Sequence, residues 1–148
     1  MNQKLTVLTK YLLDTMFYAG ILVTLTLPAS FWFYGKYNSY FREFYLELIL
    51  IFFLCGVFAI LIIGNLRKMF QTVLNDDCFV KENVKSLDRM GTYSFAIALI
   101  TVVRIFLYLT PAVIVIILTF VIAGLFSKVL AGVFDKAVTY KLENDLTI

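Results

Sequence analysis

The feature that most constrains this chain is an apolar segment that runs from Thr92 to Phe134, "TYSFAIALITVVRIFLYLTPAVIVIILTFVIAGLFSKVLAGVF". A helix that crosses a membrane needs about 20 residues. The segment is therefore too long for one such helix and just long enough for two. Pro111 disfavours helical conformation at Thr110 and suits the first turn of a following helix. The segment predicts membrane helices over residues 92–109 and 111–134, joined by a tight turn.

Two earlier apolar segments have a similar character. They cover residues 11–34 and 46–64, and the second predicts a helix that extends to about residue 74. Hydrophobic residues make up 61% of the 148-residue chain, which is more apolar surface than one soluble core can hide. We therefore expect a single all-α integral membrane domain, residues 1–148, in which four transmembrane helices form an antiparallel bundle.

Lys and Arg residues are unequally distributed between the two ends of these helices. One end holds the basic residues of the N-terminus, of the middle loop (65–91) and of the C-terminal tail (135–148), whereas the opposite loop holds Lys36 and Arg42. Basic residues accumulate in short loops on the cytoplasmic side of a membrane. This pattern predicts a multi-pass membrane protein, surrounded by the lipid bilayer, with both termini in the cytoplasm.

The middle loop and the tail have patterns that predict local structure. "NDD" is a turn signal, and "FVKENVKSLDRM" predicts a short amphipathic helix. That helix can lie on the inner leaflet or dock on an extension of the fourth membrane helix, and we favour docking. The terminal "DLTI" alternates polar and apolar residues, so it can add as a strand to a sheet edge or fill a pocket. We expect the tail to fold back onto the loop and complete a small cytoplasmic cap.

Two stretches together carry a resemblance to a known family. One is "LRKMFQTVLNDDCFVKENVKSL", and the other is the terminal "VFDKAVTYKLENDLTI". In this order and topology the chain resembles the bacterial domain-of-unknown-function family 2975, whose members are small four-helix membrane proteins that often end in "DLTI". Asp77, Cys78 and Val80 stand where that family usually has Gly, Pro and a Thr or Ser. Because Val80 cannot cap a helix, we expect Asp76 or Asp77 to supply the N-cap oxygen.

The resemblance implies a context rather than a mechanism. Genes of such proteins often lie beside one for a small helix-turn-helix regulator of the phage-repressor type. We therefore expect a non-enzymatic regulatory membrane protein whose cytoplasmic cap binds a cytosolic transcriptional regulator and makes no direct contact with nucleic acid. Acidic tail residues are expected to oppose basic loop residues. The expected partner-binding residues are Arg67, Lys68, Phe79, Glu82, Asn83, Lys85, Leu87, Glu143, Asp145, Leu146 and Ile148.

Three ionisable residues lie within or near the predicted membrane helices. Arg104 and Glu47 fall toward the outer side, where Arg104 either pairs with Glu47 or extends to the lipid headgroups, and we favour the headgroups. Asp14 can serve in a proton relay, but a local pair with Lys10 at helical spacing is the favoured interpretation. An Arg104–Glu47 cavity would favour the alternative functions, which are a small transporter or accessory subunit, or an immunity protein against a membrane-active peptide.

Small residues repeat along the fourth membrane helix and allow close helix packing. They are Ala123, Gly124, Ser127, Ala131 and Gly132. Packing inside the bundle is the favoured interpretation, and a homodimer seam is the alternative.

Catalytic and metal-binding patterns are weak in this chain. It contains no His, and its two Cys residues, Cys55 and Cys78, fall in different environments. No Ser or Cys stands beside a candidate base, and no phosphate-binding loop is present. We therefore expect no enzyme activity, no cofactor and no metal.

Overall fold

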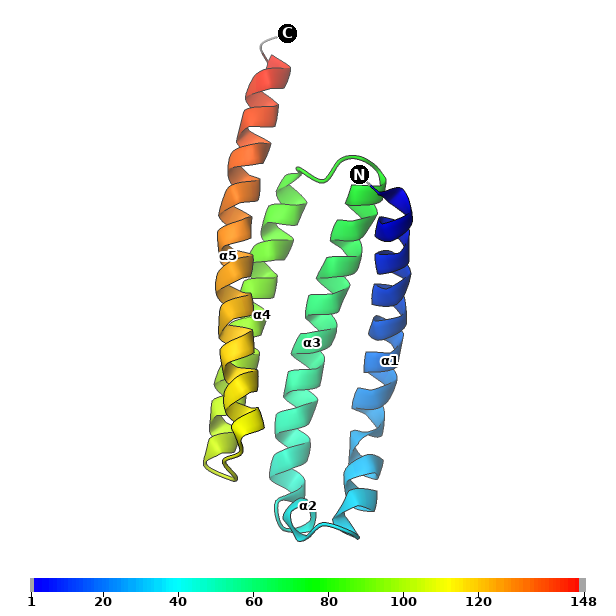
Figure 1. The fold of residues 1–148 in the computed structure, drawn as a ribbon, viewed down its shortest axis with the longest axis vertical. Coiled ribbons are helices and arrows are strands. Elements are labelled where there is room, and N and C mark those ends of the chain that lie inside the picture. The colour runs from blue at the N-terminus through cyan, green and yellow to red at the C-terminus, as the bar shows by residue number, and fades with distance from the viewer. Residues whose placement is uncertain (1, 147–148) are drawn as a thin grey trace.

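The fold of residues 2–146 is seen in a computed structural model, and these residues form helices with no β-strand (Figure 1). Four helices are long and one is a short connector. They are α1 (Gln3–Gly35), α2 (Ser39–Glu43), α3 (Tyr45–Leu74), α4 (Lys81–Ile105) and α5 (Pro111–Leu146). The long helices run in alternating directions. The start of α1, residues 75–80 and the end of α5 lie at one end of the molecule, which we call the loop end. The opposite end is called the α2 end (Figure 1).

The helix boundaries follow from local chemistry. The Asn2 side chain accepts a hydrogen bond from the Leu5 backbone N–H at 3.3 Å, so α1 begins well before residue 11. The expected break at Pro111 is confirmed, because α5 begins there and the Thr110 hydroxyl accepts from the Val113 N–H at 3.3 Å. Pro28 lies inside α1, and its carbonyl accepts a hydrogen bond from the Tyr45 hydroxyl at 3.0 Å.

Two expectations about α4 and α5 are wrong. The short loop helix and the third membrane helix form one continuous helix, because no residue between Arg89 and Tyr93 terminates it. As far as Leu146, the tail continues α5 as a helix instead of folding back or forming a strand, and residues 147–148 lie outside the described residues. No Gly or Pro interrupts residues 133–146, so α5 extends past the other helices at the loop end (Figure 1).

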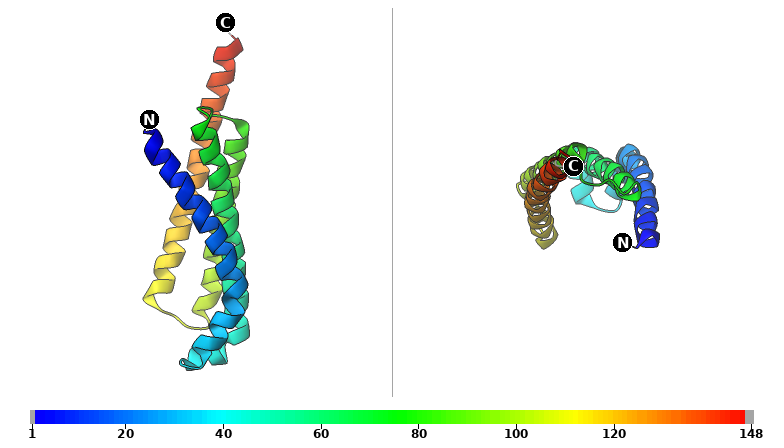
Figure 2. Two further views of the ribbon diagram at one scale, coloured as in Figure 1. Left: turned by 90° about the vertical axis from the view of Figure 1, so that its right-hand side faces the viewer. Right: turned by 90° about the horizontal axis from the view of Figure 1, so that it is seen from above.

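The long helices form an open, curved row. α3 packs between α1 and α4, and α4 packs between α3 and α5. Within residues 2–146 there is no contact between α1 and α5, and the view along the helices shows these two at opposite ends of an arc (Figure 2). The row therefore does not close into the expected bundle.

The tightest packing joins α4 to α5 through small residues. The Ser127 hydroxyl donates a hydrogen bond to the Leu87 carbonyl at 2.6 Å. Gly124 lies against the Phe95 ring, where a Cβ atom would come within 2.7 Å of it. Ala131 is buried, whereas Ala123 and Gly132 are exposed. Most of the small-residue stripe therefore packs inside the molecule, which is the favoured of the two interpretations.

Three helices are long and apolar enough to cross a membrane: α1, α3 and α5. α4 differs because its first half is charged, and only its second half, from about Tyr93, is apolar. α4 also places several polar side chains in the core, namely Asn83, Ser86, Ser94 and Thr101. The length and apolar composition of α1, α3 and α5 indicate a membrane protein.

Candidate functional site

The turn between α3 and α4 is held by one buried side chain. Asn83 is 2% exposed, and its Nδ2 group donates to the Thr72 hydroxyl and to the Cys78 carbonyl, both at 2.7 Å. Thr72 lies in the last turn of α3, so these bonds tie the end of one helix to the start of the next. Asp76 adopts a positive φ of 54°, which an acidic residue tolerates in a turn. Asn83 therefore holds the turn, and its expected role in partner binding stays a prediction.

The expected acidic cap of α4 is wrong. Val80 occupies the N-cap position in an extended conformation, and no side chain bonds to the first turn there. The Asp77 carboxylate instead accepts a hydrogen bond from Lys141 Nζ at 2.5 Å. Asp77 thereby raises the pKa of Lys141, and the pair connects the turn to the projecting part of α5.

Phe79 and Leu87 fasten this region to α5. The Phe79 ring lies 5.3 Å from the Phe134 ring, measured between centroids. Leu87 is buried, and its carbonyl accepts the Ser127 hydrogen bond. The first part of α4 thus docks on α5, which was the favoured expectation.

The basic residues of the loop end divide into paired and unpaired sets. Arg67 Nε donates to the Asp14 carboxylate at 2.5 Å, and Lys10 Nζ lies 3.5 Å from the same group. The Arg67 guanidinium also lies 4.4 Å from the centre of the Phe17 ring. The Lys10–Asp14 pair was expected from its spacing, but its extension to Arg67 links α1 to α3.

Lys68 and Lys85 line a hollow of about 360 Å³ between α3 and α4. Its other lining residues are Thr72, Glu82, Asn83, Ser86 and Arg89. Neither lysine forms an ion pair with another residue of the described chain. Four of these residues are expected binding residues from the sequence, and the structure brings them together: Lys68, Glu82, Asn83 and Lys85. Ser86 and Arg89 also line the hollow but are not among the residues expected from the sequence. The spacing of four residues between Lys85 and Arg89, about one helical turn, places both on the same face of α4 and is the sequence signal for Arg89.

The acidic tail residues do not oppose these basic residues, which corrects that expectation. Within residues 2–146, Glu143 and Asp145 form no ion pair with Arg67, Lys68 or Lys85. Both lie on the exposed final turns of α5. Ile148, also expected to bind a partner, falls outside the described residues.

An apolar stripe runs along the end of α5 and changes from covered to exposed. Phe134, Val138, Leu142 and Leu146 follow one another at a spacing of four residues, so they lie on one side of the helix. Phe134 contacts Phe79, and Val138 is only 4% exposed. Leu142 and Leu146 are 47% and 86% exposed. The second half of this stripe therefore lacks a covering surface.

The polar residues expected near the outer side do not form a pair. Among the described residues, Arg104 and Glu47 make no ion pair, and the Arg104 Nε group has no hydrogen-bond partner. The Arg104 guanidinium instead lies 5.0 Å from the centre of the Phe52 ring. Glu47 is exposed in the first turn of α3, where the helix dipole favours an acidic side chain.

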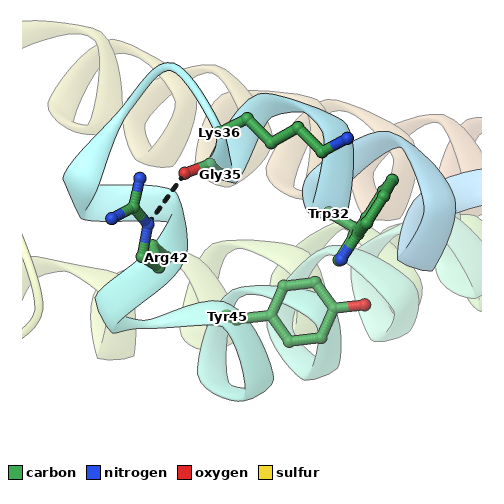
Figure 3. Close-up of a pocket in the computed structure, with 5 residues that line it drawn as sticks. All are labelled: Trp32, Gly35, Lys36, Arg42 and Tyr45. Atoms are coloured by element: carbon green, nitrogen blue, oxygen red, sulfur yellow. Dashed lines mark hydrogen bonds between the residues drawn. The ribbon is translucent and has the colours of Figure 1, made fainter.

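A second hollow, of about 400 Å³, lies at the α2 end (Figure 3). It is lined by Trp32, Gly35, Lys36, Arg42 and Tyr45. Lys36 Nζ lies 3.9 Å from the centre of the Trp32 ring, and Arg42 Nε donates to the Gly35 carbonyl at 3.1 Å. Both cations therefore already have partners within the molecule.

Comparison with known protein families decides the classification of the chain. A family model described as "Protein of unknown function (DUF2975)" matches residues 11–148. The chain belongs to this family. The match includes the α3–α4 turn and the end of α5, the two regions in which the resemblance was first seen. Comparisons with curated proteins and with solved structures give no match to this chain.

Proposed function

We propose that this DUF2975 member is a non-enzymatic regulatory protein of the bacterial cytoplasmic membrane that binds a cytosolic protein at its loop end. The proposal includes four membrane crossings with both termini in the cytoplasm. The alternating directions of α1, α3, α4 and α5 support it, because an even number of crossings leaves both termini on one side (Figure 1). The concentration of Lys and Arg at the loop end supports a cytoplasmic location for that end.

The single observation that carries the proposal is the exposed half of the α5 stripe. Leu142 and Leu146 continue a line of apolar side chains that is covered as far as Val138. A helix that presents apolar residues at this spacing suits a hydrophobic groove on another protein. Because α5 projects beyond the other helices (Figure 1), a cytosolic protein can approach it without meeting the membrane.

The loop end also holds the projecting helix in a defined position. The Lys141–Asp77 ion pair and the Phe79–Phe134 contact attach α5 to the α3–α4 turn. A helix ordered before binding loses less conformational entropy on association than a disordered tail would. The partner-binding surface proposed here therefore comprises Leu142, Leu146, Glu143 and Asp145.

The proposed partner is a helix-turn-helix transcriptional regulator. Its identity rests on the family resemblance, which associates such genes with a neighbouring regulator. The protein would hold the regulator at the membrane and would itself make no contact with DNA. Glu143 and Asp145 flank the apolar pair, so a matching groove would carry basic residues at its rim.

The test is co-purification of the full-length protein, in nanodiscs, with the regulator encoded beside its gene. We expect the wild type to retain the regulator and the variant Leu142→Ser/Leu146→Ser to lose it. Tyr140→Ser is the matched control, because Tyr140 is also exposed but lies about 200° around the helix from Leu142. Failure of the wild type to retain the regulator, or equal retention by the double variant, would overturn the proposal.

A further inference from the structure

The hollow between α3 and α4 is lined by more basic than acidic side chains. Lys68, Lys85 and Arg89 line it, and Glu82 is the acidic residue of the lining. Within residues 2–146 none of the three basic side chains forms a hydrogen bond or an ion pair. By contrast, Arg67, Lys128 and Lys141 at the same end are all paired with Asp residues. This hollow therefore has the charge of an anion-binding site.

The wall of the hollow adds neutral hydrogen-bonding groups. Ser86 is 7% exposed and lines the hollow, where its hydroxyl can donate a hydrogen bond. Asn83 and Thr72 hold each other at 2.7 Å and fix the spacing between α3 and α4. The basic residues therefore project from two helices whose separation is set by buried contacts. Such a fixed cradle distinguishes this site from basic side chains scattered over a surface.

The position of the hollow along the helices matches the level of lipid headgroups. The apolar run of α3 ends at Gly64, and Lys68 lies one turn later, about 6 Å along the axis. The apolar part of α4 begins at about Tyr93, and Arg89 lies one turn earlier, again about 6 Å away. Basic pockets between membrane helices at this level recognise anionic headgroups.

From these observations we propose that the hollow binds a phosphate group, with Lys68, Lys85 and Arg89 as its charged ligands and Ser86 as a hydroxyl donor. The phosphate belongs either to an anionic phospholipid headgroup or to a soluble phosphate ester. The position of the site favours the lipid. This site is separate from the α5 surface, so it does not depend on the regulator-binding proposal.

The test titrates the full-length protein in detergent with short-chain phosphatidylglycerol and with phosphatidylcholine, and counts bound lipids by native mass spectrometry. We expect a preference for phosphatidylglycerol that is lost in Lys85→Gln/Arg89→Gln. Each basic residue near an anionic surface contributes about fivefold to affinity, so the double variant should bind about 25-fold more weakly. Circular dichroism and thermal unfolding establish that the variant is folded.

The matched control is Lys4→Gln/Lys136→Gln, which removes the same charge from the loop end outside the hollow. A second experiment distinguishes a lipid headgroup from a soluble phosphate ester as the source of the phosphate. It measures whether glycerol 3-phosphate stabilises the protein against thermal unfolding. Stabilisation of the wild type but not of Lys85→Gln/Arg89→Gln would assign the site to soluble phosphate esters. Lipid preference without that stabilisation would assign it to the headgroup. The proposal would be overturned if Lys4→Gln/Lys136→Gln weakened phosphatidylglycerol binding as much as Lys85→Gln/Arg89→Gln does. It would also be overturned if wild type and Lys85→Gln/Arg89→Gln bound this lipid equally.

Discussion

At the scale of single residues, Asn83 connects the motif in the sequence to the geometry of the loop end. Its amide group satisfies the Cys78 carbonyl in the turn and bonds to Thr72 on α3. The Asn83 side chain is buried, so removing its amide group leaves polar partners that water replaces less well than it would on an exposed surface. Asn83 therefore sets where α4 begins, although neither Val80 nor an acidic residue caps that helix.

We predict that Asn83→Ala lowers the free energy of unfolding by about 1–3 kcal/mol, since it removes a buried amide and leaves the partly buried Cys78 carbonyl and Thr72 hydroxyl without this partner. Thermal unfolding in detergent, followed by circular dichroism, measures the change. Gln71→Ala is the control, because the Gln71 side chain makes only an exposed bond to Asn75 at 3.5 Å, and it should change stability little. Equal stability of Asn83→Ala and wild type would show that the turn does not depend on this side chain.

Sequence reasoning reached some of these residues and missed others for identifiable reasons. It selected Asn83 from the loop motif, and Lys68 and Lys85 as basic loop residues expected to oppose the acidic tail. The structure places all three around one hollow. It did not reach the Arg67–Asp14 bond, because that pair joins residues on α1 and α3 and depends on how the two helices align. Composition and spacing along one helix carry no information about such alignment.

At the scale of helices, the close approach of α4 and α5 determines the position of the loop end. Gly124 allows the Phe95 ring to lie against the α5 backbone, and Ser127 bonds to the Leu87 carbonyl. Both contacts need a small side chain on α5. The projecting end of α5 is therefore positioned by packing that lies several turns away from it.

We predict opposite effects for two Gly→Ala substitutions on α5. Gly124→Ala should destabilise the protein by about 1–3 kcal/mol, because the new methyl group would meet the rigid Phe95 ring at 2.7 Å. Gly132→Ala should be neutral or stabilise by up to about 1 kcal/mol, because nothing lies within 4 Å and Ala favours a helix. Thermal unfolding of both variants measures the difference. Stabilisation by Gly124→Ala would contradict the close packing of α4 against α5.

The helix boundaries show what a sequence pattern can and cannot predict. Pro111 fixes the start of α5 because it lacks an N–H group and restricts the preceding residue. The change from charged to apolar residues near Thr92 predicts a helix boundary, but α4 continues through it. A change in the solvent that side chains prefer does not break the backbone hydrogen bonds of a helix. The alternation in "DLTI" predicts either a strand at a sheet edge or a segment that fills a pocket, yet its first two residues, Asp145 and Leu146, continue α5.

At the scale of the whole molecule, the open row of helices leaves two unlike ends. In the hollow at the α2 end, Lys36 lies on the Trp32 ring and Arg42 donates to the Gly35 carbonyl (Figure 3). The loop end instead keeps unpaired cations in a hollow and an uncovered apolar stripe on α5. The binding surfaces that we propose all lie at the loop end, so the account requires that this end face the cytoplasm.

The location of Cys78 tests that requirement most directly. Cys78 lies in the α3–α4 turn and is partly exposed, whereas Cys55 lies within the apolar part of α3. In a Cys55→Ser background, a membrane-impermeant maleimide should label Cys78 in inverted membrane vesicles and not in intact cells. A cysteine introduced at exposed Tyr37, at the α2 end, should show the reverse pattern. Labelling of Cys78 in intact cells would place the loop end outside and contradict the account.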